Sequence, residues 1–307
     1  MQELICKIKQ LKKARQAVIL AHNYEPPEIQ DIADITGDSL GLSVDAARLD
    51  NPAIVFCGVR FMAESAAILA PAKKVLLPRL ECGCGLADMA TAVELRKMRR
   101  EKPDAVVVTY VNSSAEVKAE SDICCTSGNA VNVVKSIPEN REILFVPDRN
   151  LGAYVEEKTG RKMILWDGAC PIHDAIRAAD INKAKNAHPE ALLMVHPECR
   201  PEITKLADGV CSTGGMSDFV IQSQAKEFIV ATEEGMLYPL RKAHPDRFFY
   251  PVAPNKPNAM ICPDMKMISL EDIYKSLKNM EPIVTVPKET ADRARLALER
   301  MLAVPRN

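Results

Sequence analysis

The chain has 307 residues, 47% of them hydrophobic and 26% charged, and a formal net charge of −1. This length suits two or three compact domains, and apolar runs of only about five residues exclude a membrane-spanning segment and a secretory leader. The balanced charge excludes a chain-wide field that would attract nucleic acid or an anionic membrane. We therefore expect a cytoplasmic protein that acts on small molecules.

Residues 1–15 predict an amphipathic helix, because Leu4, Ile5, Ile8 and Leu11 fall on one face. Short apolar, β-branched segments then alternate with helical ones. The predicted strands are residues 17–24, 53–59, 74–78, 105–112, 143–147, 163–168, 192–198, 228–233 and 248–252. The predicted helices include residues 27–35, 86–103, 129–137, 172–189, 268–282 and 288–302. Such alternation is typical of an α/β protein with mostly parallel strands.

Three kinds of landmark recur along the chain at intervals of about 86 residues. They are a polar or aromatic group at a strand end, a hydroxyl beside a helix start, and a cysteine after the last strand of a unit. In that order the residues are Tyr24, Tyr110 and His196; Ser39, Ser127 and Thr213; and Cys84, Cys170 and Cys262. A regular alternation of strands would not by itself keep these side chains in register, so the spacing predicts three homologous units.

The expected fold is α/β, with three pseudo-symmetric three-layer αβα domains whose mostly parallel sheets surround a central cavity. The units are expected at residues 16–102, 103–188 and 189–282. Residues 1–15 and 283–307 are expected to form terminal helices that pack on them.

The ten cysteines are too dispersed for a disulfide framework. Ligands of parallel sheets bind beyond the carboxyl ends of the strands, so units facing one axis would bring Cys84, Cys170 and Cys262 to a single site. Three thiolates without a fourth protein ligand suggest an iron–sulfur cluster with one open iron, or a catalytic zinc. Cys82 is the rival of Cys84, because the segment ECGCG offers both.

The strand ends also supply groups for proton transfer and hydrogen bonding. These are His22, Tyr24, Tyr110, Asn112, His196 and Glu198. The hydroxyls of Ser39, Ser127 and Thr213 stand near glycines at helix starts, where backbone N–H groups favour carboxylates or phosphate. Each hydroxyl taken singly could instead be a helix N-cap. His173 could be a helix-terminal group or a neighbour of the metal centre.

Several segments resemble those of the quinolinate synthase (NadA) family, and together they cover essentially the whole chain. They are AHNYEPPEIQDIAD, GDSL, VVTYVNSSAEVKA, SGNA, WDGACPIH, HPECRPE, CSTGGM and CPDMKMISLEDIY. The resemblance implies condensation of iminoaspartate (iminosuccinate) with dihydroxyacetone phosphate to quinolinate in de novo NAD biosynthesis, with loss of phosphate and two waters. L-aspartate oxidase or aspartate dehydrogenase would supply the iminoaspartate.

The resemblance also implies residue roles. One [4Fe–4S] cluster would be held by Cys84, Cys170 and Cys262, with its open iron acting as a Lewis acid. The substrate contacts would be His22, Ser39, Tyr110, Asn112, Ser127, His196, Glu198 and Thr213. The catalytic groups would be Tyr24, as a proton carrier, together with His22, Tyr110, His196 and Glu198.

Two other functions remain open at this point. One is a three-cysteine iron–sulfur reductase or radical enzyme of another three-lobed family. It would need electron delivery, whereas the strand-end groups suit proton chemistry better. The other is an iron–sulfur sensor of a small anion, which would need a surface for a macromolecular partner, and the even charge distribution gives no sign of one.

Overall fold

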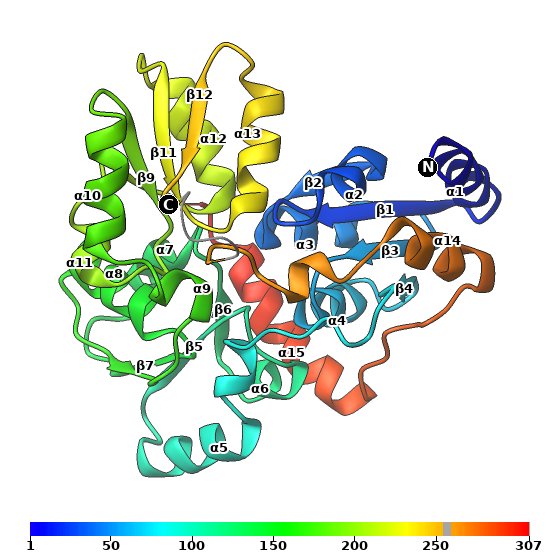
Figure 1. Cartoon of the computed structure of the whole chain (residues 1–307). Helices are drawn as coiled ribbons and strands as arrows, with labels where there is room; N and C mark the ends of the chain where they lie inside the picture. The colour runs from blue at the N-terminus through cyan, green and yellow to red at the C-terminus, as the bar shows by residue number, and fades with distance from the viewer. Residues whose placement is uncertain (254–258, 307) are drawn as a thin grey trace.

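The computed structural model describes residues 1–253 and 259–306. Its strands form three four-stranded sheets, with the orders β2-β1-β3-β4, β6-β5-β7-β8 and β10-β9-β11-β12. Neighbouring strands within each sheet are parallel, and helices cover the sheets in lobes that meet near the centre of the molecule (Figure 1). The same strand order in each sheet confirms the α/β fold with three similar lobes.

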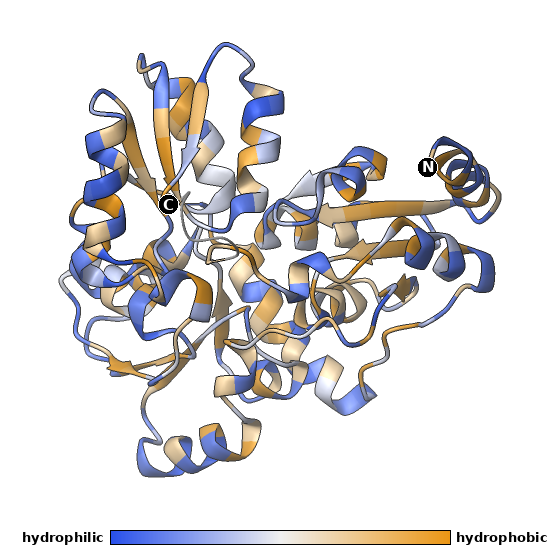
Figure 2. Cartoon of the chain, in the orientation of Figure 1, coloured by the Kyte–Doolittle hydropathy of each residue, from blue (hydrophilic) through white to orange (hydrophobic). Residues whose placement is uncertain are grey.

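The strands are short and almost all of their residues are buried or half-buried. The first sheet contains β1 (Ala17–His22), β2 (Ile35–Gly37), β3 (Ala53–Cys57) and β4 (Lys74–Leu76). The second contains β5 (Val106–Tyr110), β6 (Ile123–Cys125), β7 (Ile143–Val146) and β8 (Ile164–Leu165). The third contains β9 (Leu192–Val195), β10 (Gly209–Val210), β11 (Glu227–Ala231) and β12 (Phe248–Pro251). Figure 2 shows apolar strands inside each lobe and helices with hydrophilic outer faces.

The helices connect these strands. Up to β5 they are α1 (Gln2–Ala14), α2 (Pro27–Ile32), α3 (Ser39–Arg48), α4 (Arg60–Leu69), η1 (Ala87–Met89) and α5 (Ala92–Glu101). Up to β9 they are α6 (Ala115–Ala119), α7 (Ala130–Ser136), α8 (Arg149–Thr159), α9 (Pro171–Asp174) and α10 (Ala178–Ala187). The remainder are α11 (Pro201–Thr204), α12 (Thr213–Gln222), η2 (Glu234–Met236), α13 (Leu237–Ala243), η3 (Asp264–Lys266), α14 (Leu270–Asn279) and α15 (Lys288–Leu302).

The single helices expected at residues 86–103 and 172–189 are each divided in two. The first divides because Thr91 and Glu94 form a capping box that starts a new helix, α5. In the second, the Asp180 carboxylate accepts the backbone N–H of Arg177 at 3.1 Å where α10 begins. None of the described helices is both long and apolar enough to cross a membrane.

An aspartate just before the second strand of each unit repeats throughout the molecule. Its carboxylate accepts a backbone N–H of the first strand at 2.7–2.8 Å, in the pairs Asp34–Ile19, Asp122–Val107 and Asp208–Leu193. Each carboxylate also pairs with a basic side chain of the helix before that first strand, in the pairs Asp34–Lys12, Asp122–Arg99 and Asp208–Lys185. The pseudo-symmetry therefore extends to individual hydrogen bonds, and it makes α1, α5 and α10 equivalent helices.

The helix after each landmark cysteine packs on the next sheet around the axis. Leu95 of α5 lies in one apolar cluster with Val107 of the second sheet, and Ile181 of α10 lies in another with Leu193 of the third. Helix α14 returns to α1 and β3 of the first sheet, and α15 packs between α4 of the first lobe and α6 and β6 of the second. The domain limits expected from the sequence group α5 and α10 with the preceding unit, and those limits remain a prediction.

Candidate active site

A cavity of about 290 Å³ lies between the three sheets. It is lined by residues that follow the carboxyl ends of strands in all three lobes, where parallel sheets bind ligands. Each residue of the predicted site lines it: His22, Tyr24, Ser39, Cys84, Tyr110, Asn112, Ser127, Cys170, His196, Glu198, Thr213 and Cys262. The structure thus brings these side chains together, while their chemical roles remain predictions.

Three of the lining residues are the landmark cysteines, one from each unit. Burial raises the pKa of the Cys84 thiol to about 12 and that of Cys170 well above its ordinary value, and burial also raises that of Cys262. A bound cation would act in the opposite direction, because it stabilises thiolates. Cys82 is fully buried and lies outside the lining, so the geometry favours Cys84 over Cys82.

A second donor set overlaps the first. The sulfur of Cys170, a ring nitrogen of His173 and a carboxylate oxygen of Glu198 lie within 4.8 Å of one another. Nδ1 of His173 is 3.2 Å from Cys170 Sγ and 2.6 Å from Glu198 Oε2. This buried group of Cys, His and Glu could hold a metal ion.

A chain of hydrogen bonds crosses the cavity wall, and we call its five members the relay. The hydroxyl of Tyr24 lies 2.6 Å from Thr232 Oγ1, which lies 2.8 Å from His173 Nε2. His173 Nδ1 meets one oxygen of Glu198, and the hydroxyl of Tyr110 donates to the other at 2.6 Å. The relay therefore joins two phenols through a hydroxyl, an imidazole and a carboxylate, all of them buried.

The ionisation states along the relay follow from burial and contact. Burial by itself would raise the pKa of Glu198, but contacts with His173, His196 and Tyr110 lower it below the ordinary value. Burial raises the pKa of Tyr24 and Tyr110 well above the usual value, and the Glu198 charge adds to that rise. Near neutral pH Glu198 is therefore a carboxylate and both phenols keep their protons.

His22 and His196 are held in the same way at the ends of two equivalent strands. The backbone N–H of Tyr24 donates to Nδ1 of His22 at 3.2 Å, and that of Glu198 donates to Nδ1 of His196 at 3.4 Å. Burial lowers the pKa of His22 to about 4 and that of His196 to about 3, so both rings are neutral near pH 7. Because Nδ1 accepts, each neutral ring carries its hydrogen on Nε2 and can donate it to a ligand.

The turns that carry Ser39, Ser127 and Thr213 meet at the axis, and we call them the hydroxyl turns. Helices α3 and α12 are capped by the preceding residues, Asp38 and Ser212, which accept from backbone N–H groups at 2.7 and 3.2 Å. The hydroxyls of Ser39 and Thr213 therefore do not cap these helices. A Cβ on Gly214 would lie 2.5 Å from Asp38 Oδ2, so the first and third turns touch, and a side chain at this position would displace the Asp38 carboxylate.

Asn112 brings an unsatisfied acceptor to the cavity. Its side-chain oxygen Oδ1 is buried and has no hydrogen-bond partner among the described residues. The loop around it is held by the fully buried Lys118, whose ammonium donates to the carbonyl of Ser113 at 2.5 Å. An unpaired buried acceptor beside the cavity would be satisfied by a ligand that donates a hydrogen bond.

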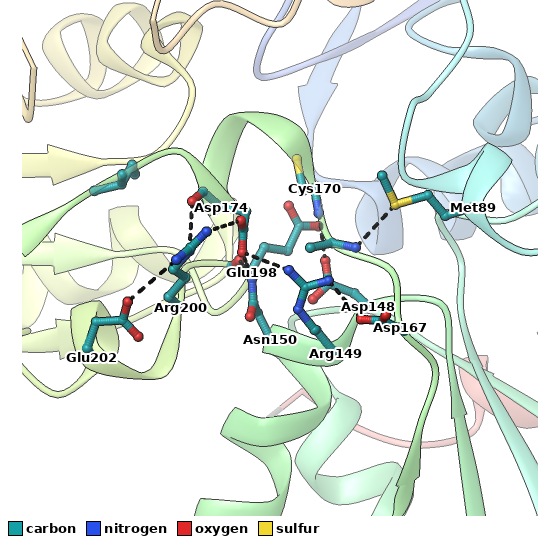
Figure 3. Close-up of polar contacts among 12 residues, drawn as sticks. Met89, Asp148, Arg149, Asn150, Asp167, Cys170, Asp174, Glu198, Arg200 and Glu202 are labelled. Atoms are coloured by element: carbon teal, nitrogen blue, oxygen red, sulfur yellow. Dashed lines mark hydrogen bonds and ion pairs between the residues drawn. The ribbon is translucent and has the colours of Figure 1, made fainter.

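A polar network supports the cavity from behind, at the junction of the second and third lobes (Figure 3). Asp148, the N-cap of α8, accepts the backbone N–H of Cys170 at 3.2 Å. The side-chain amide of Asn150 donates to the carbonyl of Glu198 at 3.0 Å and to the carboxylate of Asp174 at 2.9 Å. The network thereby fixes the backbone of one cysteine and of the relay carboxylate.

Sequence reasoning missed two residues of this site. Thr232 directly follows the buried strand β11, so a polar residue at a strand end was the available signal. Asp38 precedes Ser39 in GDSL and lines the cavity. Both lie next to residues or strands that the repeat had marked. Asp38 matches the N-cap Ser212 in position but carries a charge. Thr232 matches Gly58 and Pro147, neither of which has a side-chain group that can form a hydrogen bond.

The comparisons with known proteins agree with this geometry. The family model described as Quinolinate synthetase A protein matches residues 6–303. A quinolinate synthase of Geotalea uraniireducens is 54% identical over 305 residues, which cover 99% of both chains. One from Methanosarcina barkeri is 54% identical over 302 residues, which cover 98% of both chains. The chain belongs to the quinolinate synthase (NadA) family.

Proposed function

We propose that this chain is a quinolinate synthase that condenses iminoaspartate (iminosuccinate) with dihydroxyacetone phosphate, releasing phosphate and two waters. The observation that carries the proposal is that the three units each contribute a cysteine and a hydroxyl turn to one buried cavity that also holds the relay. The names and full-length similarity of the relatives support the same activity.

One [4Fe–4S] cluster is part of the proposal, with Cys84, Cys170 and Cys262 as its ligands. Three thiols from three lobes at one cavity are the donor set expected for a cluster with one iron free of protein ligands. When bound, such a cluster supplies a Lewis-acidic iron for a substrate oxygen. His173, at 3.2 Å from Cys170 Sγ, would orient that ligand.

The relay moves protons during imine formation, ring closure and aromatisation. Tyr24 keeps its proton near neutral pH and can donate it, and Thr232 and His173 connect its oxygen to the Glu198 carboxylate, which can accept one. Tyr110 donates to Glu198 and holds it in place. Proton exchange along a buried chain of this kind needs no bulk water.

The hydroxyl turns orient the anionic groups of the substrates. The hydroxyls of Ser39, Ser127 and Thr213 and the nearby backbone N–H groups would bind the carboxylates and the phosphate. The neutral rings of His22 and His196 would donate from Nε2. Asn112 would accept from a substrate hydroxyl or amine, which would satisfy its unpaired oxygen.

The proposal also includes the source of one substrate and the compartment of the reaction. Iminoaspartate would come from L-aspartate oxidase or aspartate dehydrogenase, and the reaction would take place in the cytoplasm. Both substrates are small anions, in keeping with the size of the cavity.

The test is an anaerobic assay of the iron-loaded protein with both substrates and no added reductant. We expect quinolinate to accumulate, whereas a reductase or radical enzyme of another family would need an electron donor. Glu198→Gln should keep its iron and lose turnover, because it removes the acceptor of the relay. Full iron loading without any quinolinate would refute the proposal, and full activity of Glu198→Gln would remove Glu198 from the mechanism.

A further inference from the structure

Residues 303–306 run from the end of α15 to the axis where the hydroxyl turns meet. The buried side-chain amide of Asn129, the residue before α7, donates to the carbonyls of Met301 and Val304 at 3.2 and 3.4 Å. Asn132 of α7 donates to the carbonyl of Arg306 at 2.8 Å. The second lobe thus binds the backbone of this segment, and the Arg306 side chain is not needed for that attachment.

The guanidinium of Arg306 reaches the first lobe. Nη1 lies 2.6 Å from Asp38 Oδ2, and Nη2 lies 3.0 Å from Asp38 Oδ1. Two parallel hydrogen bonds of this kind fix both the position and the orientation of a carboxylate. The Asp38 side chain is only 8% exposed, and its Oδ1 also accepts the backbone N–H of Gly41, which starts α3 with Ser39 in place.

The same pair touches the third lobe. A Cβ on Gly214 would lie 2.6 Å from Arg306 Nη1 and 2.5 Å from Asp38 Oδ2. Asp38 and Thr213 also form a wall shared by the main cavity and a second one of about 470 Å³, which Arg306 lines. The Arg306–Asp38 pair therefore lies between two cavities and contacts the starts of both α3 and α12.

Asp38 creates an electrostatic problem for the proposed substrates. It lines the cavity beside Ser39 and Thr213, where the proposed function requires carboxylates and a phosphate to bind. An uncompensated carboxylate at that place would repel each of these anions, because charges interact strongly where water is excluded. Arg306 supplies the compensating charge from the opposite side of the wall.

We propose that Arg306 is a positioning residue for anionic substrates, which neutralises Asp38 in the cavity wall. This inference rests on the proposed function, since it assumes that the ligands are anions. It assigns a role in substrate binding to residues 303–306, which lie far from the cysteines in the sequence and outside the repeated units.

The test compares Arg306→Ala, Asp38→Asn and the double variant with the wild-type protein. Arg306→Ala should raise the KM for dihydroxyacetone phosphate and the Kd for quinolinate by about tenfold, with a much smaller change in kcat, because it leaves a negative charge beside the bound anion. Adding Asp38→Asn should restore both values to within about threefold of the wild type, since asparagine still caps α3 but carries no charge. Arg306→Lys should fall between, because it keeps the charge without the paired hydrogen bonds.

Two measurements keep structural effects apart from electrostatic ones. Arg300→Ala removes a guanidinium from the last turn of α15, which donates to the carbonyl of Asp122 at 2.6 Å, and should leave KM and Kd unchanged. Thermal unfolding and iron content should be alike in all variants.

The outcomes distinguish failure of the Arg306 inference from failure of the proposed function. A double variant no better than Arg306→Ala would show that Arg306 acts only through the fold, and an Arg306→Ala protein with wild-type KM and Kd would also overturn the inference. A wild-type protein that neither forms nor binds quinolinate would overturn the proposed function itself, and the inference would fall with it.

Discussion

The hydroxyl turns and the relay line the same cavity but relate differently to the three repeats. Each hydroxyl turn is a copy of the others, placed after the second strand of its sheet. The relay uses equivalent positions that carry different side chains: Tyr24 and Glu198 each lie two residues beyond the histidine of an equivalent strand, and Thr232 has Gly58 and Pro147 at the matching positions. The comparison teaches that the groups proposed to hold anions and metal are repeated in all three units, whereas the relay is made of side chains that differ from one unit to the next.

The largest effect is expected from replacing a cysteine, because each of the three cysteines is both a repeated residue and a proposed cluster ligand. Cys170→Ala should abolish both iron binding and quinolinate formation, because two thiols cannot retain a cluster that needs three. Iron and sulfide counting, with about four of each expected per wild-type chain, measures the effect. Cys82→Ala is the matched control and should keep both, and loss of iron from that variant instead would make Cys82 the ligand.

Breaking the hydrogen bonds of the relay should lower kcat without changing KM. Thr232→Val keeps the shape of the side chain but breaks the contacts of 2.6 and 2.8 Å to Tyr24 and His173. We expect kcat to fall by about a hundredfold, as for the loss of one general acid–base step, with KM and iron content unchanged. Thr159→Val, on the surface-facing helix α8, serves as the control. A normal kcat for Thr232→Val would exclude proton transfer through this hydroxyl.

Glu25 is another side chain without a copy, since Ser113 and Cys199 hold the equivalent positions. Burial raises its pKa from 4.5 to about 8, and neither carboxylate oxygen has a hydrogen-bond partner in the described part of the chain. Between these pH values the folded state keeps a proton that the unfolded state releases, so stability falls as pH rises.

Glu25→Gln should remove this pH dependence. Relative to the wild-type protein, Glu25→Gln should raise the free energy of unfolding at pH 8 by about 3 kcal/mol more than it does at pH 5. Urea unfolding at the two pH values measures the change. Glu28→Gln, at an exposed position in α2, should change neither value, and equal pH profiles for Glu25→Gln and the wild type would contradict the raised pKa of Glu25.

The hydroxyl turns should give the smallest effect, because three copies share the binding. Ser39→Ala and Thr213→Val should each raise the KM for dihydroxyacetone phosphate by about fivefold, the loss of one hydrogen bond to a charged group, and leave kcat nearly unchanged. Ser43→Ala in the same helix, α3, is the control. A hundredfold fall in kcat for either variant would move that hydroxyl from binding to proton transfer.

The sequence predicted best what the repeat preserved. The spacing alone predicted that Cys84, Cys170 and Cys262 line one cavity together with the hydroxyl turns, because equivalent strand ends of similar sheets face one axis. The repeated aspartates Asp34, Asp122 and Asp208 obey the same spacing and were missed. They lie at the starts of short strands, where an acidic residue is usually taken for a loop position.

The rest could not be predicted from one sequence for physical reasons. Packing of α5 and α10 on the following sheet depends on which apolar surfaces meet, and a helical pattern does not specify its partner. The approach of Thr232 to Tyr24 joins the third lobe to the first, and that of Arg306 to Asp38 joins two distant parts of the chain. Such contacts follow from the assembled geometry and leave no periodic signal.

The return of α14 to the first sheet has a consequence for synthesis. A chain that emerges from its N-terminus completes the strands of the first lobe early, yet α14 and α15, which pack against that lobe, follow the strands of all three sheets. Domains generally fold as they emerge from the ribosome. Here, however, the surfaces of the first lobe that contact α14 and α15 stay exposed until these two helices have been made. Cys262, the third of the proposed cluster ligands, lies only shortly before them in the sequence, so under the proposed function the cluster would assemble after all three lobes have been made.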